Sequence, residues 1–141
     1  MASDWTEPVR SLLEAPSAAV LTTYRKDGSA LVSPVWFRCH DGAFEVVIVE
    51  GDVKLRHLRR DPRCVIVVFE STPPFRGVEA RGNAELVDGD VTAVRADCAR
   101  RYLGAEAGER FFRERASSPG VLVRLRADAP RVWDLSEILP A

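Results

Sequence analysis

Short β-prone runs separated by turn residues constrain the fold of this chain more than any other feature of its sequence. The run Ala19–Tyr24 is rich in branched and aromatic residues, and the Asp27-Gly28 pair that follows suits a tight hairpin turn. A second run covers residues 30–38, and another Asp-Gly pair separates it from a third run over residues 43–49. This spacing predicts a meander of three antiparallel strands.

The rest of the sequence predicts helices and further strands. Residues 64–70 are almost wholly apolar, which indicates a strand in the centre of a sheet. Residues 75–87 are expected to form one long strand. Gly82 inside this strand predicts a bulge or a close approach of two chain segments. The other expected strands are 120–126 and 130–135, and the expected helices are 5–15, 53–60, 91–103 and 107–116. We therefore expect a mainly β fold with flanking helices, as a single domain over residues 1–141.

Charge and cysteine content exclude several classes of function. Twenty basic and twenty-one acidic side chains leave a net charge of −1, so no strongly basic field is available to bind a nucleic-acid backbone. No apolar run approaches the roughly 20 residues that span a bilayer, and the first residues lack the pattern of a signal peptide. Three widely spaced cysteines do not suggest a disulfide framework. We expect a cytoplasmic protein with reduced thiols and with neither a nucleic-acid nor a membrane partner.

Familiar motifs of catalysis and metal binding are scarce. The sequence contains no Gly-x-Ser-x-Gly elbow and no glycine-rich phosphate or dinucleotide fingerprint. Cys39, His40, His57 and Cys64 could converge on a zinc ion, but their spacing matches none of the usual ligand patterns. Small buried thiols and ordinary histidines are the simpler interpretation, and we expect no metal site.

The start of the predicted helix 53–60 is the clearest candidate for a binding site. A helix N-terminus presents unpaired N–H groups and a partial positive charge, which favour an anion. Lys54 in the first turn and Arg56 two residues later add cationic donors, a combination that suits a phosphate ester on a small ligand. The alternative is a solvated basic helix that Asp52 caps. A carboxylate in the cap position would also compete with a bound phosphate.

Pro34 interrupts the run 30–38 and marks a second candidate region. Proline cannot donate a hydrogen bond to a neighbouring strand, so backbone groups near it are left without their usual partners. These groups could contact a planar heterocycle, to which Trp36 would offer an aromatic face. The alternative is an edge strand whose Trp36 and Phe37 are divided between the core and the surface.

Three segments follow one another in the order of a recurrent family pattern: AVLTTYRKDGSALVSPVWF (19–37), KLRHLRRDPRCV (54–65) and VEARGNAEL (78–86). They resemble the pyridoxamine 5′-phosphate oxidase-like split β-barrel family, and they look closest to its deazaflavin (coenzyme F420)-dependent reductases. The resemblance implies a six-stranded antiparallel split β-barrel of the FMN-binding type. It also implies a homodimer with two cofactor sites at the subunit interface.

The resemblance assigns candidate cofactor-binding residues. The assigned positions are Lys54 and Arg56 for the cofactor phosphate, Ser33, Pro34, Val35 and Trp36 along the ring system, and Phe75 and Arg76 in a loop that closes the site. Two positions depart from the family pattern. Asp52 stands where several relatives carry a basic residue, which weakens the expected phosphate site, and His57 replaces a more usual asparagine.

The function implied by the resemblance is hydride transfer from reduced deazaflavin to a small conjugated or aromatic acceptor. The alternatives are an FMN-dependent oxidase or reductase of the same fold, and a non-catalytic protein that binds a cofactor, fatty acid or haem. In such chemistry the cofactor supplies the reactivity, and the protein supplies position and a dry pocket. Tyr24, His40, His57 and Tyr102 are proton-donor candidates by residue type only, and solvent could deliver the proton instead.

Overall fold

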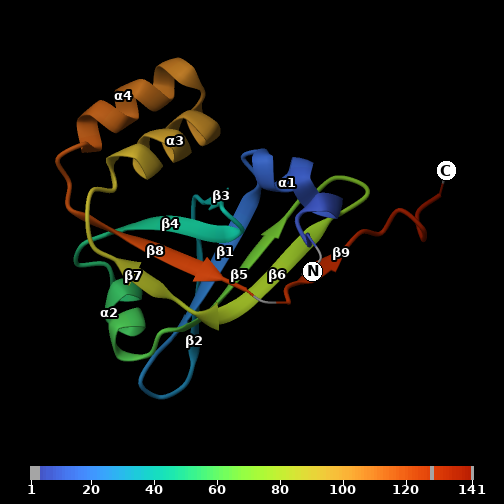
Figure 1. Cartoon of the computed structure of the whole chain (residues 1–141), viewed down its shortest axis with the longest axis horizontal. Coiled ribbons are helices and arrows are strands. Elements are labelled where there is room, and N and C mark those ends of the chain that lie inside the picture. Colours follow the sequence, from blue (N-terminus) through green and yellow to red (C-terminus); the bar gives the residue numbers. More distant parts are fainter. Residues whose placement is uncertain (1–3, 128, 141) are drawn as a thin grey trace.

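Two antiparallel sheets, joined where the chain crosses between them, form the body of the protein (Figure 1). The computed structural model describes residues 4–127 and 129–140. The first sheet consists, in spatial order, of β2 (Ala30–Pro34), β1 (Ala18–Tyr24), β5 (Arg63–Phe69), β6 (Gly77–Asn83) and β9 (Arg131–Trp133). The second consists of β3 (Arg38–His40), β4 (Ala43–Val49), β8 (Gly120–Arg126) and β7 (Glu85–Val87).

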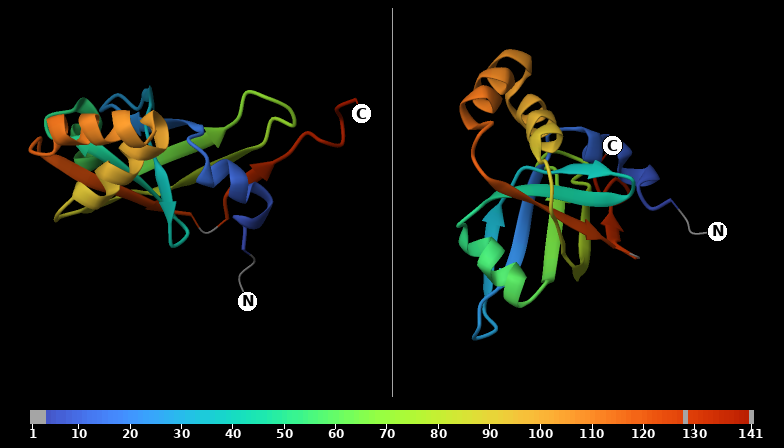
Figure 2. Two further views of the ribbon diagram at one scale, coloured as in Figure 1. Left: turned by 90° about the horizontal axis from the view of Figure 1, so that it is seen from above. Right: turned by 60° about the vertical axis from the view of Figure 1, so that its left-hand side comes forward.

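Helices flank these sheets. The helical segments are a 3₁₀ turn (Glu7–Val9), α1 (Arg10–Glu14), α2 (Val53–Arg60), α3 (Thr92–Leu103) and α4 (Ala105–Arg115). Helix α3 contacts β3 and β4, and the α3–α4 hairpin projects beyond the second sheet in Figure 1 and in the right view of Figure 2. Within the described ranges, no helix combines the length and the apolar character needed to cross a membrane.

Several sequence predictions are confirmed. Helix α2 and strand β8 have the predicted bounds, and the apolar run 64–70 forms β5, which lies between β1 and β6 in the first sheet. The core lies between the two sheets, where Leu21, Phe44 and Ile66 are almost fully buried. Leu55 and Leu58 of α2 join the same core, so burial of this helix face fixes the position of the residues at its start.

The predicted three-stranded meander is wrong, because the run 30–38 divides between the two sheets. Strand β2 ends at Pro34 and pairs with β1 in the first sheet, whereas β3 begins at Arg38 and pairs with β4 in the second. Pro34 lies on the edge strand β2, where a residue without an N–H group is tolerated. The next residue, Val35, still donates its N–H to Ala19 O of β1 at 3.0 Å, and the chain leaves the first sheet after this bond. Residues 35–37, the crossing segment, connect the two sheets.

The run 75–87 divides in the same way, into β6 and β7 of different sheets. Gly82 forms no bulge, since it pairs in register with Cys64, but the expected close approach is confirmed. A Cβ atom at Gly82 would lie 3.1 Å from Leu125 Cδ1 of the second sheet. The mainly β fold with flanking helices is confirmed, whereas a six-stranded barrel is not, because the described residues form nine strands in two separate sheets.

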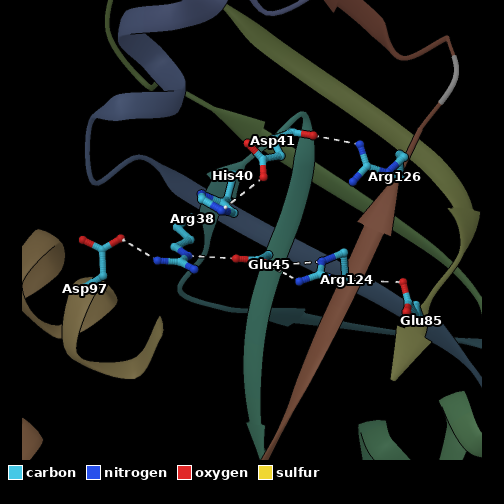
Figure 3. Close-up of polar contacts among 8 residues, drawn as sticks. All are labelled: Arg38, His40, Asp41, Glu45, Glu85, Asp97, Arg124 and Arg126. Atoms are coloured by element: carbon cyan, nitrogen blue, oxygen red, sulfur yellow. Dashed lines mark hydrogen bonds and ion pairs between the residues drawn. The ribbon is translucent and has the colours of Figure 1, made fainter. Parts of the chain in front are cut away.

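A buried carboxylate ties the second sheet together (Figure 3). Glu45 on β4 is 1% exposed and accepts hydrogen bonds from Arg38 Nε on β3 at 2.8 Å and from Arg124 on β8 at 2.8 and 3.0 Å. Burial alone raises the pKa of Glu45, but the hydrogen bonds from Arg124 and Arg38 outweigh this effect and hold the pKa below its ordinary value. The carboxylate is therefore ionised at neutral pH and links three strands.

We expect Glu45→Gln to lower the free energy of unfolding by about 3 kcal/mol at pH 7, because it removes one partner of a buried ion pair. A lowered pKa contributes stability above the ordinary glutamate pKa, and this stability is lost as the pH falls through the folded-state value. The variant should therefore lose less stability than the wild type on acidification. Denaturant unfolding at several pH values measures both effects.

The matched control for this prediction is Glu85→Gln. Glu85 is 68% exposed and lies 4.0 Å from the same Arg124, so its loss should change the free energy of unfolding by less than about 1 kcal/mol. Equal destabilisation by the two substitutions would contradict a special role for Glu45.

Candidate functional site

A groove with a volume of about 220 Å³ lies between the crossing segment, the end of β4 and the start of α2. Pro34, Val35 and Trp36 form one side, residues 46–49 of β4 form the floor, and Asp52 and Lys54 stand at the end where α2 begins. The structure thus brings together four of the predicted cofactor-binding residues, which are Pro34, Val35, Trp36 and Lys54. The surface of the groove is mainly apolar, with its charged groups at one end.

Asp52 caps α2, as the sequence predicts, and it also pairs with Lys54. Its Oδ1 accepts the backbone N–H of Lys54 at 2.8 Å, and its Oδ2 lies 3.0 Å from Lys54 Nζ. Partial burial raises the pKa of Asp52, but the two hydrogen bonds from Lys54 outweigh it, so the pKa lies below its ordinary value. The Lys54 side chain is 17% exposed. The ammonium group at the groove is therefore already neutralised by a neighbouring carboxylate.

The other four predicted cofactor-binding residues lie outside this groove. Ser33 is half-buried in β2, where it pairs with Leu21, and Arg56 is exposed on α2. Phe75 and Arg76 lie in the loop between β5 and β6, at the opposite end of β5 from α2 (Figure 1).

The loop residue Arg76 already has partners within the chain. Its Nε lies 2.7 Å from Glu70 Oε2, and its Nη1 donates to Ser11 Oγ at 2.7 Å. Hydrogen bonds to Glu70 raise the pKa of the Arg76 guanidinium. The role of this loop in closing a cofactor site stays a prediction.

Three backbone groups of the crossing segment have hydrogen-bond partners within the chain. The Val35 N–H donates to Ala19 O at 3.0 Å. The Phe37 N–H donates to Tyr102 Oη at 3.4 Å, and the Phe37 carbonyl accepts a hydrogen bond from Arg101 Nη1. Three groups that sequence analysis left for a planar ligand are thus used inside the protein, two of them by α3.

Trp36 contacts two aromatic side chains of the α3–α4 hairpin, stacked on Tyr102 and tilted relative to Phe111. Its ring centroid lies 5.2 Å from that of Tyr102 with an interplanar angle of 4°, and 5.2 Å from that of Phe111 with an angle of 56°. Tyr102 therefore covers a face of the indole that the sequence predicted to be open to a ligand. No local pattern in the sequence indicated that Tyr102 and Phe111 share Trp36 as a partner.

The proton-donor candidates lie away from the groove, since none of the four lines it. His57 is buried, with its Nδ1 2.9 Å from Thr23 Oγ1, and burial lowers its pKa, so it is neutral at pH 7. Burial raises the pKa of Tyr102, whose hydroxyl donates to Ser17 O at 2.9 Å. Tyr24 is half-buried on β1, and His40 is exposed beside Asp41 (Figure 3).

The cysteines have the environment of unreactive thiols. Burial raises the pKa of Cys39, Cys64 and Cys98 to about 11, so each is protonated at neutral pH. In the described ranges, no three His, Cys, Asp or Glu side chains are grouped so that they could hold a metal ion.

A sequence profile described as pyridoxamine 5′-phosphate oxidase matches residues 5–134, which include every element that forms the groove. The chain belongs to the pyridoxamine 5′-phosphate oxidase family. This confirms the family resemblance of the three sequence segments. No curated protein matches this chain.

Solved structures share the fold of this family member. A conserved hypothetical protein, Rv2991 from Mycobacterium tuberculosis, is 23% identical with a TM-score of 0.77, and the match covers 100% of this chain and 91% of the other. An F420 reductase is 23% identical with a TM-score of 0.70, covering 93% and 98%. An FAD-binding protein from Mesorhizobium loti is 19% identical with a TM-score of 0.63, covering 90% of each chain. At these identities the likeness shows a common fold.

We expect Tyr102→Phe to lower the free energy of unfolding by about 1–3 kcal/mol, because it leaves backbone groups of Ser17 and Phe37 without their partner while keeping the ring on Trp36. Denaturant unfolding followed by tryptophan fluorescence measures the loss. The matched control is Tyr24→Phe, since the Tyr24 ring packs under Arg63, 5.1 Å from its guanidinium, and this contact does not involve the hydroxyl. Equal stability of the two variants would contradict the role of the Tyr102 hydroxyl.

Proposed function

We propose that this protein is a deazaflavin (coenzyme F420)-dependent oxidoreductase that transfers a hydride to a small conjugated or aromatic acceptor. The observation that carries the proposal is the groove, where Lys54 stands at one end of an apolar wall formed by the crossing segment and β4. Membership of the family and the common fold with an F420 reductase support this choice of cofactor. FMN is the alternative cofactor.

The residues of the groove fit a ligand with a planar apolar part and an anionic end. Lys54 would hold a phosphate, Pro34 and Val35 would lie along the ring system, and Val47 would exclude water from its other edge. When bound, the reduced deazaflavin supplies the hydride, and the protein contributes position and a dry surface. We assign the proton to solvent, because the four side chains considered as donors lie outside the groove.

The ion pair between Asp52 and Lys54 favours a second candidate function. A phosphate must displace an ionised carboxylate from Lys54 Nζ before it can bind there. Weak cofactor binding of this kind suits a non-catalytic protein that carries or sequesters a ligand.

We expect opposite effects from Lys54→Ala and Asp52→Asn on cofactor affinity. Lys54→Ala should weaken binding by about 1.5–3 kcal/mol, because a charge-assisted hydrogen bond is lost. Asp52→Asn should strengthen binding, because asparagine still caps the helix but does not neutralise Lys54. Fluorescence titration of each variant with F420 and with FMN measures both effects.

Several outcomes separate the candidates. Unchanged titrations of Lys54→Ala with both cofactors would remove Lys54 from the site, and purification of a yellow protein with bound FMN would overturn the preference for deazaflavin. Oxygen consumption would indicate the FMN-dependent function, because deazaflavin lacks the ring nitrogen that lets flavins react with oxygen. Binding of reduced deazaflavin without oxidation by any acceptor would favour the non-catalytic candidate.

The cytoplasmic location stays a prediction.

We further propose that two chains form a homodimer with the cofactor site at their interface. The groove of one chain, at about 220 Å³, is smaller than the roughly 300–1,000 Å³ typical of small-molecule pockets. Large apolar side chains are exposed around it, with Val32 57%, Val49 53% and Val53 40% exposed. A second chain placed on these residues would bury them and supply the missing wall.

We expect Val32→Glu to shift the protein from dimer to monomer, because it introduces a charge into the proposed apolar interface. Sedimentation velocity at several protein concentrations measures this shift. Ile138→Glu is the matched control, since Ile138 is 77% exposed and lies in the C-terminal segment far from α2 (Figure 1). A monomeric wild-type protein would contradict the proposed homodimer.

A further inference from the structure

A second cavity, with a volume of about 210 Å³, adjoins the groove. It lies between β4 and the α3–α4 hairpin, and Trp36, Val47 and Val49 line both the cavity and the groove. A ligand in this second cavity would therefore meet a cofactor in the groove across a shared wall.

The lining of this cavity combines an apolar surface with positive charge. Cys98 and Phe111 extend the apolar wall that Trp36 begins, while Arg95 and Arg115 bring two guanidinium groups. No Asp or Glu lines the cavity, and within the described part of the chain neither arginine forms an ion pair. An anionic group would find uncompensated charge here.

The two arginines differ in how firmly they are held. Arg95 Nη1 donates to the carbonyls of Arg115 at 3.1 Å and Ser118 at 2.7 Å, which fixes its guanidinium against the end of α4. Arg115 is exposed and its guanidinium carbon lies 5.7 Å from the Phe111 ring centroid. Arg115 is thus free to turn toward a ligand, while Arg95 provides a fixed charge.

We propose that this cavity binds the acceptor and that the acceptor is a planar conjugated or aromatic carboxylate. The planar part would pack on Trp36 and Phe111, and the carboxylate would pair with Arg115, which guanidinium geometry favours. The role as acceptor site rests on the proposed function. In that reaction one C=C bond of the acceptor would gain a hydride from reduced deazaflavin and a proton from water, and the oxidised deazaflavin would return a proton to the water.

The test compares trans-cinnamate with its neutral amide, cinnamamide, as probes of the full-length protein without cofactor. The shift of the Trp36 indole N–H resonance, assigned with Trp36→Phe, reports binding at the cavity. We expect cinnamate to bind about tenfold more tightly than cinnamamide, because only the acid forms a charge-assisted bond. Arg115→Gln should remove most of this difference and leave the affinity for cinnamamide unchanged.

Arg113→Gln is the matched control, because Arg113 lies on the same helix, is 71% exposed and pairs with Glu109 at 3.8 Å. It should keep the preference for cinnamate. Equal affinities for the two probes, no shift of the Trp36 resonance, or equal effects of the two substitutions would overturn the proposal.

A parallel titration with F420 separates this proposal from the proposed function. Binding of cinnamate without binding of F420 would support the carboxylate site and overturn the deazaflavin-dependent function. Binding of F420 without a preference for cinnamate would support the deazaflavin-dependent function and overturn the carboxylate site.

Discussion

The candidate site depends on hydrogen-bond partners for the backbone groups of the crossing segment between the two sheets. A chain that leaves one sheet and enters another loses its regular ladder partners, and buried N–H and C=O groups then need partners from elsewhere. Ala19 O of β1 accepts the Val35 N–H, and helix α3 supplies the partners of Phe37 through the Tyr102 hydroxyl and the Arg101 guanidinium. Arg101 also donates to the carbonyls of Leu13 and Ala15 at 2.8 and 2.9 Å. Helix α3 therefore holds the crossing segment, and with it one wall of the groove, in place against the N-terminal helices.

The carboxylates of Glu45 and Asp52 both form ion pairs, but the two pairs have different consequences because they differ in burial. Glu45 is almost fully buried and shared by two arginines from neighbouring strands, so its charge stabilises the second sheet. Asp52 is 30% exposed and pairs with a lysine two residues away at the edge of a groove. A pair within one helical turn costs little to separate compared with a buried bridge. Separation of Lys54 from Asp52 should therefore cost less stability than separation of Arg38 and Arg124 from Glu45.

Local patterns predicted the parts of the structure that local interactions determine. Helix α2, its cap at Asp52 and the central strand β5 follow from capping chemistry and apolar runs. The division of residues 30–38 between two sheets could not be predicted, because Pro34 signals a break in a strand but not the destination of the chain after it. The stacking of Trp36 on Tyr102 joins residues 66 positions apart, and nothing in either segment indicates the other. For the same reason, sequence analysis named four residues that line the groove but gave no sign of the cavity beside it.

The position of the α3–α4 hairpin in the connectivity has an evolutionary consequence. Strands β7 and β8 pair directly in the second sheet, so the residues between them form an excursion that the sheet itself does not require. The last turn of α3 is constrained, because Arg101 and Tyr102 hold the crossing segment. Helix α4, which carries Phe111 and Arg115, contacts the crossing segment through the Phe111 ring, but the side-chain hydrogen bonds to the backbone of Phe37 come from α3. Descendants of this protein could therefore change the cavity beside α4 while the groove is inherited unchanged.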